Sequence, residues 1–220
     1  DCGIEQGSPE ADIFNRKPWI FNPSEIDILL VTHAHADHIG RIPRLVRDGF
    51  KGIIYSTAET KEITKLMFED ATKLVAKEAL QKNIEKLYEE DDVMKTFSLW
   101  KTIEYHENFK LHEGYSVYLK DAGHVLGSSM FELTVTDIVG AYPEVDGKPL
   151  SRKIVFTGDL GNTPSPLLRD TEEITDADYL LMESVYGDRN HEERDQRLLK
   201  LADAIEDNHR RKGVLLMPMF

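Results

Sequence analysis

The sequence predicts an α/β fold that carries a metal site, and three observations support this. Short apolar runs rich in β-branched residues alternate with segments of helical periodicity. A cluster of histidine and aspartate follows the first of these runs directly. The hydrophobic content of 40% and the charged content of 30% are typical of a chain that folds around a core.

The first half of the chain is expected to alternate between strands and helices. Residues 26–31 (IDILLV) form a short apolar run typical of a strand buried on both faces. From Asp37, apolar residues recur at helical spacing up to Gly49, which is expected to end the helix, and residues 52–55 return as a strand. Residues 57–88 form a long helical region. Its apolar stripe is expected to pack in the core and consists of Ile63, Leu66, Met67, Leu74 and Val75.

The second half is expected to be richer in strands. Apolar or alternating runs predict strands at residues 116–121, 130–136, 153–157, 179–182 and 214–217. A turn-rich piece at residues 143–149 lies between them. A last helix, at about residues 193–209, has late basic residues that suit the helix dipole. Its apolar face carries Leu198, Leu201, Ala202 and Ile205.

Composition and charge restrict the class of protein. The 220 residues suffice for one large domain, or for one domain with part of another. With a net charge of −13, a polyanionic partner would need a local basic patch or a bound metal. The single cysteine, Cys2, excludes an internal disulfide, and no stretch approaches the about 20 apolar residues of a membrane span, so a reducing cytoplasm is expected. A start without Met and an apolar run at residues 213–220 suggest truncation at both ends.

Residues 33–38 (HAHADH) carry the strongest functional signal. Three imidazoles and one carboxylate follow a strand directly, a pattern that core packing does not require. Alternate residues of an extended segment point the same way, so His33 and His35 can hold one cation while Asp37 and His38, at the start of a helix, address a second. Such donors without nearby cysteine favour an open catalytic zinc site over a structural zinc finger. The alternative, a solvated histidine-rich loop, leaves the aspartate unexplained.

Two further donor candidates lie in glycine-rich turns after strands. His124 stands in DAGHVLGS at residues 121–128, and Asp159 stands in FTGDLG at residues 156–161. Glycine lets the backbone bring a ligand close, although either residue alone is more often part of a turn or a cap. Their order after the histidine cluster favours metal binding. The remaining histidines show no ligand spacing and are expected at the surface or in packing; they are His106, His112, His191 and His209.

These motifs resemble those of the metallo-β-lactamase superfamily, and the resemblance extends over nearly the whole chain. In order, the motifs are HxHxDH, GH before a turn of small residues, and TGDLG. The resemblance implies an αββα four-layer sandwich whose first strands precede residue 1, with Asp1 orienting the site. It also implies two zinc ions. His33, His35 and His124 would bind one zinc, Asp37 and His38 would bind the other, and Asp159 would bridge them.

Within the superfamily, ESVYGDR at residues 183–189 is similar to the acidic motif of the β-CASP nucleases, a group that includes ribonuclease J and the cleavage-and-polyadenylation endonuclease. Val185 stands where the group usually has threonine. The resemblance implies a metallo-β-lactamase-like domain at residues 1–194 and the start of an inserted β-CASP cap domain at residues 195–220. The two later histidines of the group are not found, so the second zinc site is expected to be incomplete in this chain.

The resemblance further implies a zinc-dependent hydrolase that cleaves phosphodiester bonds of single-stranded RNA by a metal-bound hydroxide. Two metals about 3.5–4 Å apart can supply that hydroxide and neutralise charge in the transition state. The residues expected to act in catalysis are Asp37, Asp159 and Glu183. Two alternatives remain: a hydrolase of a small ester, thioester or lactam, and a non-catalytic subunit of a processing complex. No membrane partner is expected, and homo-oligomerisation is left open.

Overall fold

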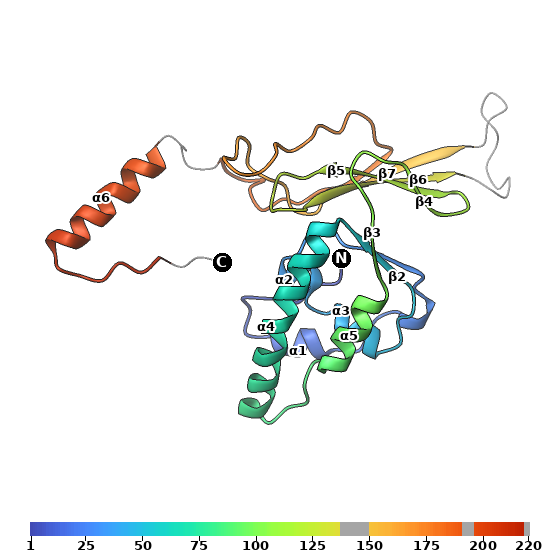
Figure 1. Ribbon diagram of the computed structural model, residues 1–220, viewed down its shortest axis with the longest axis horizontal. Coiled ribbons are helices and arrows are strands. Elements are labelled where there is room, and N and C mark those ends of the chain that lie inside the picture. The colour runs from blue at the N-terminus through green and yellow to red at the C-terminus, as the bar shows by residue number, and fades with distance from the viewer. Residues whose placement is uncertain (137–149, 191–195, 218–220) are drawn as a thin grey trace. The chain divides into compact units, whose positions relative to one another are not determined.

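The computed structural model describes residues 1–136, 150–190 and 196–217. The chain forms two compact units, Asp1–Glu183 and Ser184–Phe220, which are described separately (Figure 1). The turn-rich piece expected at residues 143–149 and the start of the last predicted helix, residues 193–195, lie outside the described residues. The division into a metallo-β-lactamase-like domain and a cap domain stays a prediction.

The first sheet of the Asp1–Glu183 unit, called sheet A, has three parallel strands in the order β1-β2-β3. They are β1 (Ile28–Leu30), β2 (Ile53–Ser56) and β3 (Trp100–Thr102). Ile54 and Tyr55 of the central strand are buried, as expected for a parallel sheet that is covered on both faces. The strands predicted at residues 26–31 and 52–55 are confirmed. β3 was not expected, because its residues, WKT, do not form an apolar run like those of β1 and β2.

The second sheet, called sheet B, has five strands in the order β4-β5-β6-β7-β8. They are β4 (Phe109–His112), β5 (Tyr115–Asp121), β6 (Ser129–Thr136), β7 (Ser151–Phe156) and β8 (Tyr179–Leu181). The strands β4 to β7 pair in antiparallel fashion, and β8 joins β7 in parallel. The strands predicted for β5 to β8 are confirmed. Because alternate strands of an antiparallel sheet run in the same direction, β5 and β7 end at the same edge.

Helices complete the described part of this unit. They are α1 (Ala11–Arg16), the 3-10 helix η1 (Pro23–Glu25), α2 (Ala36–Ile39), α3 (Ile42–Arg47), α4 (Ala58–Lys82) and α5 (Glu90–Ser98). The prediction of one helix from Asp37 to Gly49 is wrong, because this segment forms α2 and α3. Pro43 would clash with the preceding turn of a continuous helix, and it is instead found in the first turn of α3, where it is tolerated. None of the helices among the described residues combines the length and hydropathy that a membrane crossing requires.

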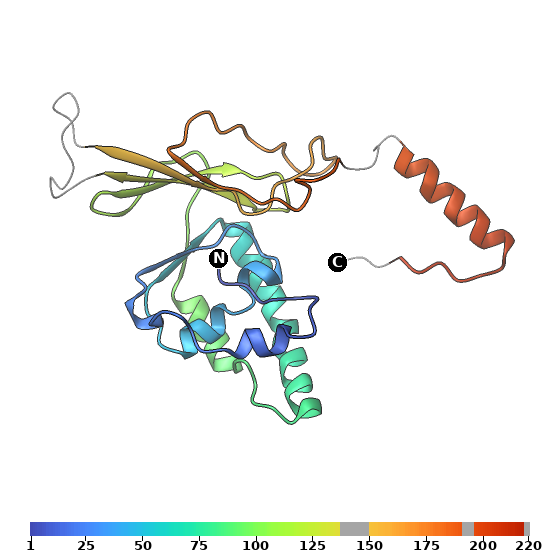
Figure 2. The ribbon, with the colours of Figure 1, turned by 180° about the vertical axis from the view of Figure 1, so that it is seen from behind.

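Two clusters of buried side chains define the layers of the Asp1–Glu183 unit. One cluster, which includes Ile42, Ile54 and Phe68, joins the helices to sheet A. The other, which includes Tyr55 and Phe131, lies between sheet A and sheet B. Helices, sheet A and sheet B therefore follow one another as layers (Figure 2), which confirms an α/β fold with two sheets and flanking helices. The fourth layer of the αββα sandwich stays a prediction, because every helix described in residues 1–136 and 150–183 precedes β4.

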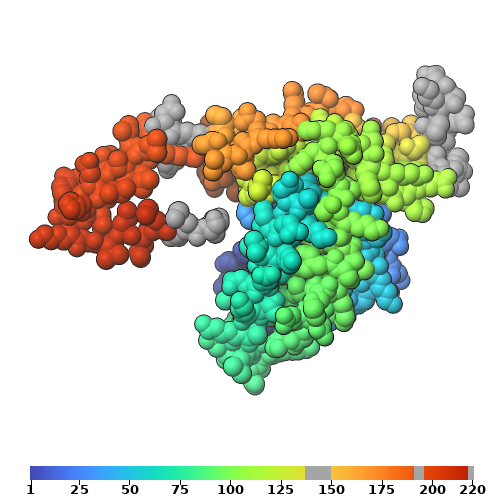
Figure 3. All heavy atoms as spheres, viewed as in Figure 1, coloured from blue at the N-terminus to red at the C-terminus, as the bar shows by residue number. Residues whose placement is uncertain are grey.

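The apolar stripe of α4 is not core packing, and that prediction is wrong. Leu66 is 67% exposed and Leu74 is 58% exposed, whereas Phe68 on the adjacent face is buried. α4 lies at the surface of its unit over much of its length (Figure 3). The helix buries Thr60 and Thr64 on the side that faces the core, so hydrophobicity alone did not identify the packed face. α4 also ends before residue 88, because Asn83 adopts the left-handed conformation that ends helices.

In the Ser184–Phe220 unit, the described residues contain one helix, α6 (Arg197–Arg210). This confirms the last predicted helix from residue 197 onward, and its apolar residues, such as Leu198, are exposed. The strand predicted at residues 214–217 is wrong, because this segment is irregular and Val214 and Leu216 are exposed. A strand needs a hydrogen-bonded neighbour, and none of the residues described in this unit provides one.

Leu66 and Phe68 allow a direct test of which face of α4 is packed. Phe68→Ala is expected to lower the free energy of unfolding by about 3–5 kcal/mol, because the ring loses its buried contacts and leaves a cavity. Leu66→Ala is expected to change it by less than about 0.5 kcal/mol, because the side chain is exposed. Urea denaturation followed by circular dichroism measures both values. A comparable loss for Leu66→Ala would contradict this assignment of the faces.

Candidate metal centre

The residues predicted to bind metal lie at strand ends along one edge of the two sheets. The segment after β1 supplies His33, His35, Asp37 and His38, the turn after β5 supplies His124, and the turn after β7 supplies Asp159. His35 has extended backbone angles and occupies the N-cap position of α2, so the following residues turn away into the helix. Since β5 and β7 end at the same edge, their turns lie together.

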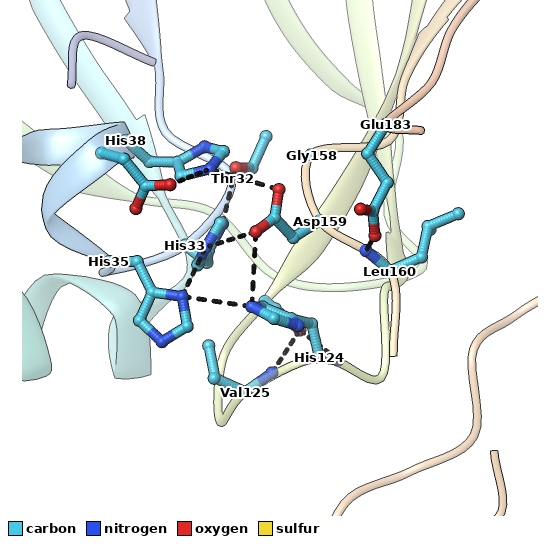
Figure 4. A network of polar contacts seen from close by, with 12 residues as sticks. Thr32, His33, His35, His38, His124, Val125, Gly158, Asp159, Leu160 and Glu183 are labelled. Atoms are coloured by element: carbon cyan, nitrogen blue, oxygen red, sulfur yellow. Dashed lines mark hydrogen bonds and ion pairs between the residues drawn. The ribbon is translucent and has the colours of Figure 1, made fainter. Parts of the chain in front are cut away.

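The first donor group consists of His33, His35, His124 and Asp159, whose ligand atoms all lie within 4.8 Å of one another. His33 Nε2 lies 3.0 Å from His35 Nδ1, which lies 3.1 Å from His124 Nε2. Asp159 Oδ2 lies 3.8 Å from His33 Nε2 and 3.6 Å from His124 Nε2. Figure 4 shows the three rings and the carboxylate pointing toward one another.

Asp37, His38 and Asp159 form a second donor group. His38 Nε2 lies 3.3 Å from Asp159 Oδ1 and 3.8 Å from Asp37 Oδ2. Asp159 therefore belongs to both groups and presents a different oxygen to each. The Asp37 side chain is 54% exposed, so the second group is the more accessible to solvent.

The donors of the first group fit a zinc ion. Tetrahedral zinc with bonds of about 2.0–2.1 Å separates its ligand atoms by about 3.3 Å. The separations of 3.0–3.8 Å between His33, His35, His124 and Asp159 lie on both sides of that value. Imidazole nitrogen and carboxylate oxygen are also donors that zinc prefers. The cluster can therefore hold a metal ion.

Asp1 and Thr32 contact the ring nitrogens of His38 and His33 that face away from the two donor groups. Asp1 Oδ2 lies 2.8 Å from His38 Nδ1, and Asp1 also accepts hydrogen bonds from Thr32 N (2.7 Å) and Thr32 Oγ1 (2.8 Å). Thr32 Oγ1 lies 3.0 Å from His33 Nδ1. Such partners fix the orientation of metal-binding imidazoles. The orienting role implied for Asp1 thus has a direct contact, whereas Thr32 carried no signal that sequence reasoning could use.

Burial controls the charge of the histidines. Burial, followed by repulsion from the rings of His38, His35 and His124, lowers the pKa of His33 from 6.5 to about 2. Burial also lowers the pKa of His124, although the charge of Asp159 opposes this. His33 and His124 are therefore neutral at neutral pH, and the neutral imidazole is the form that binds a metal.

The turn that carries His124 is held from two sides. Ser128 Oγ accepts a hydrogen bond from the backbone amide of His124 at 3.1 Å. At the start of α4, Thr57 Oγ1 and Thr60 Oγ1 both donate to the carbonyl oxygen of Gly127, at 2.7 and 2.9 Å. The turn is thereby joined to the helix layer as well as to sheet B.

The turns that carry His124 and Asp159 are in direct backbone contact. Gly161 N donates to the carbonyl oxygen of Ala122 at 2.8 Å. A Cβ atom on Gly161 would lie 1.9 Å from the carbonyl oxygen of Gly123. Gly123 has a φ of +64°, which lies in the left-handed region. Only glycine fits at these two positions without displacing the backbone. The glycines beside both donors therefore allow the close approach of the turns.

Glu183 belongs to neither donor group. Its Oε1 accepts a hydrogen bond from Leu160 N at 2.6 Å, so it contacts the main chain of the residue that follows Asp159 (Figure 4). The catalytic role expected of Glu183 stays a prediction. Neither donor group contains the other histidines that the structure describes, which are His106, His112 and His209.

Comparison with known proteins identifies the family. Residues 1–140 match the metallo-beta-lactamase superfamily domain. The chain is 33% identical over 220 residues to Ribonuclease TTHA0252 of Thermus thermophilus. The aligned region covers 100% of this chain and 45% of that protein. It is 31% identical over 225 residues to cleavage and polyadenylation specificity factor subunit 3-I of Arabidopsis thaliana (100% and 29% covered). It is 29% identical over 204 residues to Endoribonuclease YSH1 of Candida glabrata (91% and 24% covered).

The chain belongs to the metallo-β-lactamase superfamily, because the domain match spans more than half of its 220 residues. Its resemblance to the β-CASP ribonucleases is confirmed by similarity that extends along the whole chain. The chain spans less than half the length of each of these three relatives.

The donor assignment predicts metal content. Protein purified without chelator is expected to contain zinc, and His35→Ala should lose about one equivalent because the first donor group then lacks a nitrogen. His112→Ala serves as the control, since His112 is an exposed histidine outside both groups. Elemental analysis measures the zinc in each preparation. Equal zinc in the two variants would refute the assignment of His35.

The low pKa of His33 predicts how the stability of the metal-free protein depends on pH. Folded His33 stays neutral down to about pH 2, whereas the same ring in the unfolded chain takes up a proton near pH 6.5. Lowering the pH below 6.5 therefore stabilises the unfolded chain, and the free energy of unfolding should fall continuously from there toward pH 2. Urea denaturation in chelator at about pH 8 to about pH 5 measures this slope. His33→Asn should flatten it, and an unchanged slope in that variant would contradict the role of His33.

Proposed function

We propose that the protein is a zinc-dependent hydrolase that cleaves phosphodiester bonds of single-stranded RNA, in RNA processing or decay. One observation carries the proposal: Asp159 joins two adjacent donor groups in a chain that is similar over its whole length to a protein named as a ribonuclease. Because the chain covers 45% of that ribonuclease, the activity is proposed for the complete native protein.

The donor set suits hydrolysis of a phosphodiester, which is both stable and anionic. When bound, two metal ions would supply hydroxide at neutral pH and neutralise charge on the phosphate oxygens. Asp159 presents Oδ2 to the first donor group and Oδ1 to the second, so one carboxylate would hold both ions at neighbouring positions. His33 is neutral at neutral pH, so it does not have to lose a proton before it binds an ion.

Other residues of the centre would act by proton transfer and by positioning. Asp37 has a half-exposed carboxylate in the accessible donor group, where an oxygen can take up a proton from the attacking nucleophile. Asp1 holds the His38 ring with its Nε2 toward Asp159. Glu183 would support catalysis by fixing Leu160, and with it the turn that carries Asp159.

Single-stranded RNA is the substrate class that fits the recessed donors best. His33 is fully buried, and the side chains of His38, His124 and Asp159 are only 16%, 24% and 27% exposed. An unstacked single strand can bend into a recess, whereas a rigid duplex cannot. The similarity to Ribonuclease TTHA0252 and to Endoribonuclease YSH1 also supports RNA as the substrate.

The net charge of −13 does not argue against this substrate. Local fields decide binding at a recessed site, and two divalent ions would reverse the sign of the field there. The overall charge mainly affects the approach of the RNA and its dependence on salt. We also propose a cytoplasmic location, because the chain has one cysteine and so no internal disulfide.

Two other functions remain to be separated from this one by experiment. A hydrolase of a small ester, thioester or lactam would use the same donors, but the similarity to the ribonucleases continues beyond residue 140, where the superfamily-domain match ends. A non-catalytic subunit of a processing complex would not need two adjacent groups of closely spaced metal donors. Both groups are present among the described residues.

The test is digestion of labelled single-stranded RNA by the complete native protein. Cleavage is expected with Zn²⁺ and is expected to stop when a chelator is added, because the donors act only through a bound metal. Asp159→Asn should lower the rate by more than about 100-fold, since it removes a charge shared by both groups. Asp176→Asn is the control, because Asp176 is a surface carboxylate that pairs with Lys153.

A lactam and a thioester are tested beside the RNA to distinguish the alternatives. Hydrolysis of either small substrate without RNA cleavage would overturn the proposal in favour of the small-molecule hydrolase. A protein that binds zinc, binds RNA and hydrolyses none of these substrates would favour the non-catalytic subunit.

A further inference from the structure

We propose that Thr171 and Glu172 are positioning residues that hold the turn carrying His124 against the turn carrying Asp159. Both lie in an irregular segment between β7 and β8, residues 169–172, and neither belongs to a donor group. The inference rests on the metal-binding part of the proposed function. It does not depend on the substrate.

Thr171 is placed between the two turns. Its Oγ1 lies 2.9 Å from the carbonyl oxygen of Ala122 and 3.3 Å from the carbonyl oxygen of Gly161, so one hydroxyl is shared between them. Ala122 lies two residues before His124, and Gly161 lies two residues after Asp159. The hydroxyl therefore links the main chain on either side of the contact between the turns.

The 169–172 segment also packs directly on the glycine next to His124. A Cβ atom on Gly123 would lie 2.7 Å from Thr171 N, 2.9 Å from Thr171 Oγ1 and 3.0 Å from the carbonyl oxygen of Arg169. Thr171 N is itself held by Thr163 Oγ1 at 3.2 Å. A backbone packed this closely cannot shift without moving the turn that it contacts.

Glu172 pins the start of the same turn through two backbone atoms of one residue. Its amide donates to the carbonyl oxygen of Asp121 at 3.0 Å, and its Oε2 accepts from the Asp121 amide at 2.6 Å. Asp121 is the last residue of β5, and its Oδ1 accepts from Gly123 N at 2.8 Å. Glu172 thereby helps to fix Asp121, and Asp121 in turn holds Gly123, the residue that precedes His124.

His106 supports the Glu172 carboxylate from the other side. Its Nε2 lies 2.9 Å from Oε1 and 2.8 Å from Oε2 of Glu172. Burial raises the pKa of Glu172, but the hydrogen bonds from His106 and from the Asp121 amide outweigh burial and hold that pKa below its usual value. Glu172 therefore stays ionised and keeps its acceptor role. His106 is a surface residue, as expected, but it has a specific partner.

Small displacements matter here because zinc ligands keep their distances within about 0.2 Å. A turn that relaxes by more than this moves His124 Nε2 out of the first donor group while leaving the residue folded. Loss of an outer contact of this kind typically costs about 10–100-fold in metal affinity. The proposal thus predicts a defect in metal binding that exceeds any defect in stability.

Asp178 provides a matched control elsewhere on sheet B. Its amide donates to the carbonyl oxygen of Lys153 at 2.9 Å, and its Oδ2 accepts from the Lys153 amide at 2.8 Å, the same pair of bonds that Glu172 makes to Asp121. Arg152 Nη1 lies 3.4 Å from Asp178 Oδ1, so Asp178 also has a basic partner, as Glu172 has His106. The side chains of Glu172 and Asp178 are 36% and 38% exposed. Among the described hydrogen bonds of Asp178, none reaches a turn that carries a donor.

The experiment compares Glu172→Ala, Glu172→Gln and Asp178→Ala in the complete native protein. Titration with Zn²⁺ against a chromophoric chelator measures metal affinity, and urea denaturation without metal measures stability. Glu172→Ala is expected to weaken Zn²⁺ binding by about 10-fold, and Glu172→Gln should restore most of it because the amide oxygen still accepts. Asp178→Ala should lower stability by a similar amount but change the affinity by less than about 2-fold.

Equal affinities for Glu172→Ala and Asp178→Ala would overturn the proposal, since Glu172 would then act only on stability. If Glu172→Ala does not fold without metal, Thr171→Val replaces it: about 10-fold weaker binding with recovery in Thr171→Ser supports the proposal, and wild-type affinity overturns it. A wild-type protein that binds Zn²⁺ but cleaves no RNA removes the proposed substrate and leaves this inference standing. A wild-type protein that binds no Zn²⁺ overturns both.

Discussion

One backbone hydrogen bond joins the two sheets at the edge where the donors meet. Ser129 N, at the start of β6, donates to the carbonyl oxygen of Thr32 at 2.9 Å. Thr32 immediately precedes His33, and the turn before Ser129 carries His124, so this bond brings the end of β1 to the turn after β5. Because β5 and β7 end at the same edge, the turn after β7 places Asp159 close to His124. The centre thus depends on the registration of sheet A against sheet B.

The same arrangement brings ring nitrogens of three histidines next to one another. Three imidazole nitrogens face one another at 3.0–3.1 Å, so protonation of any one of these rings places positive charge against its neighbours. Burial keeps His33 neutral, and Asp1 holds the His38 ring in place from the opposite side. The fold therefore gathers polar ring nitrogens in a confined space, which is an unfavourable arrangement for a core and a favourable one for a metal.

Much of the donor set could be predicted from local patterns in the sequence. The long-range packing of the chain could not be predicted in this way. The alternation in HAHADH and the glycines beside His124 and Asp159 are visible within a few residues. The exposed face of α4 is different, because Leu66 and Phe68 are both apolar and only the position of sheet A decides which is buried. Glu172 and His106 are 66 residues apart, and neither stands in a recognisable motif. Their contact depends on the path of the irregular segment that follows β7 and carries Glu172.

The contact between Gly161 and Gly123 restricts which sequences can build this centre. Because a Cβ atom at Gly161 would lie 1.9 Å from a carbonyl oxygen, almost any mutation there must open the gap between the two turns. A homologue could therefore keep every histidine and aspartate and still lose the spacing between His124 and Asp159. We therefore expect these two glycines to be a stricter criterion for an intact centre in a related chain than the presence of every ligand residue.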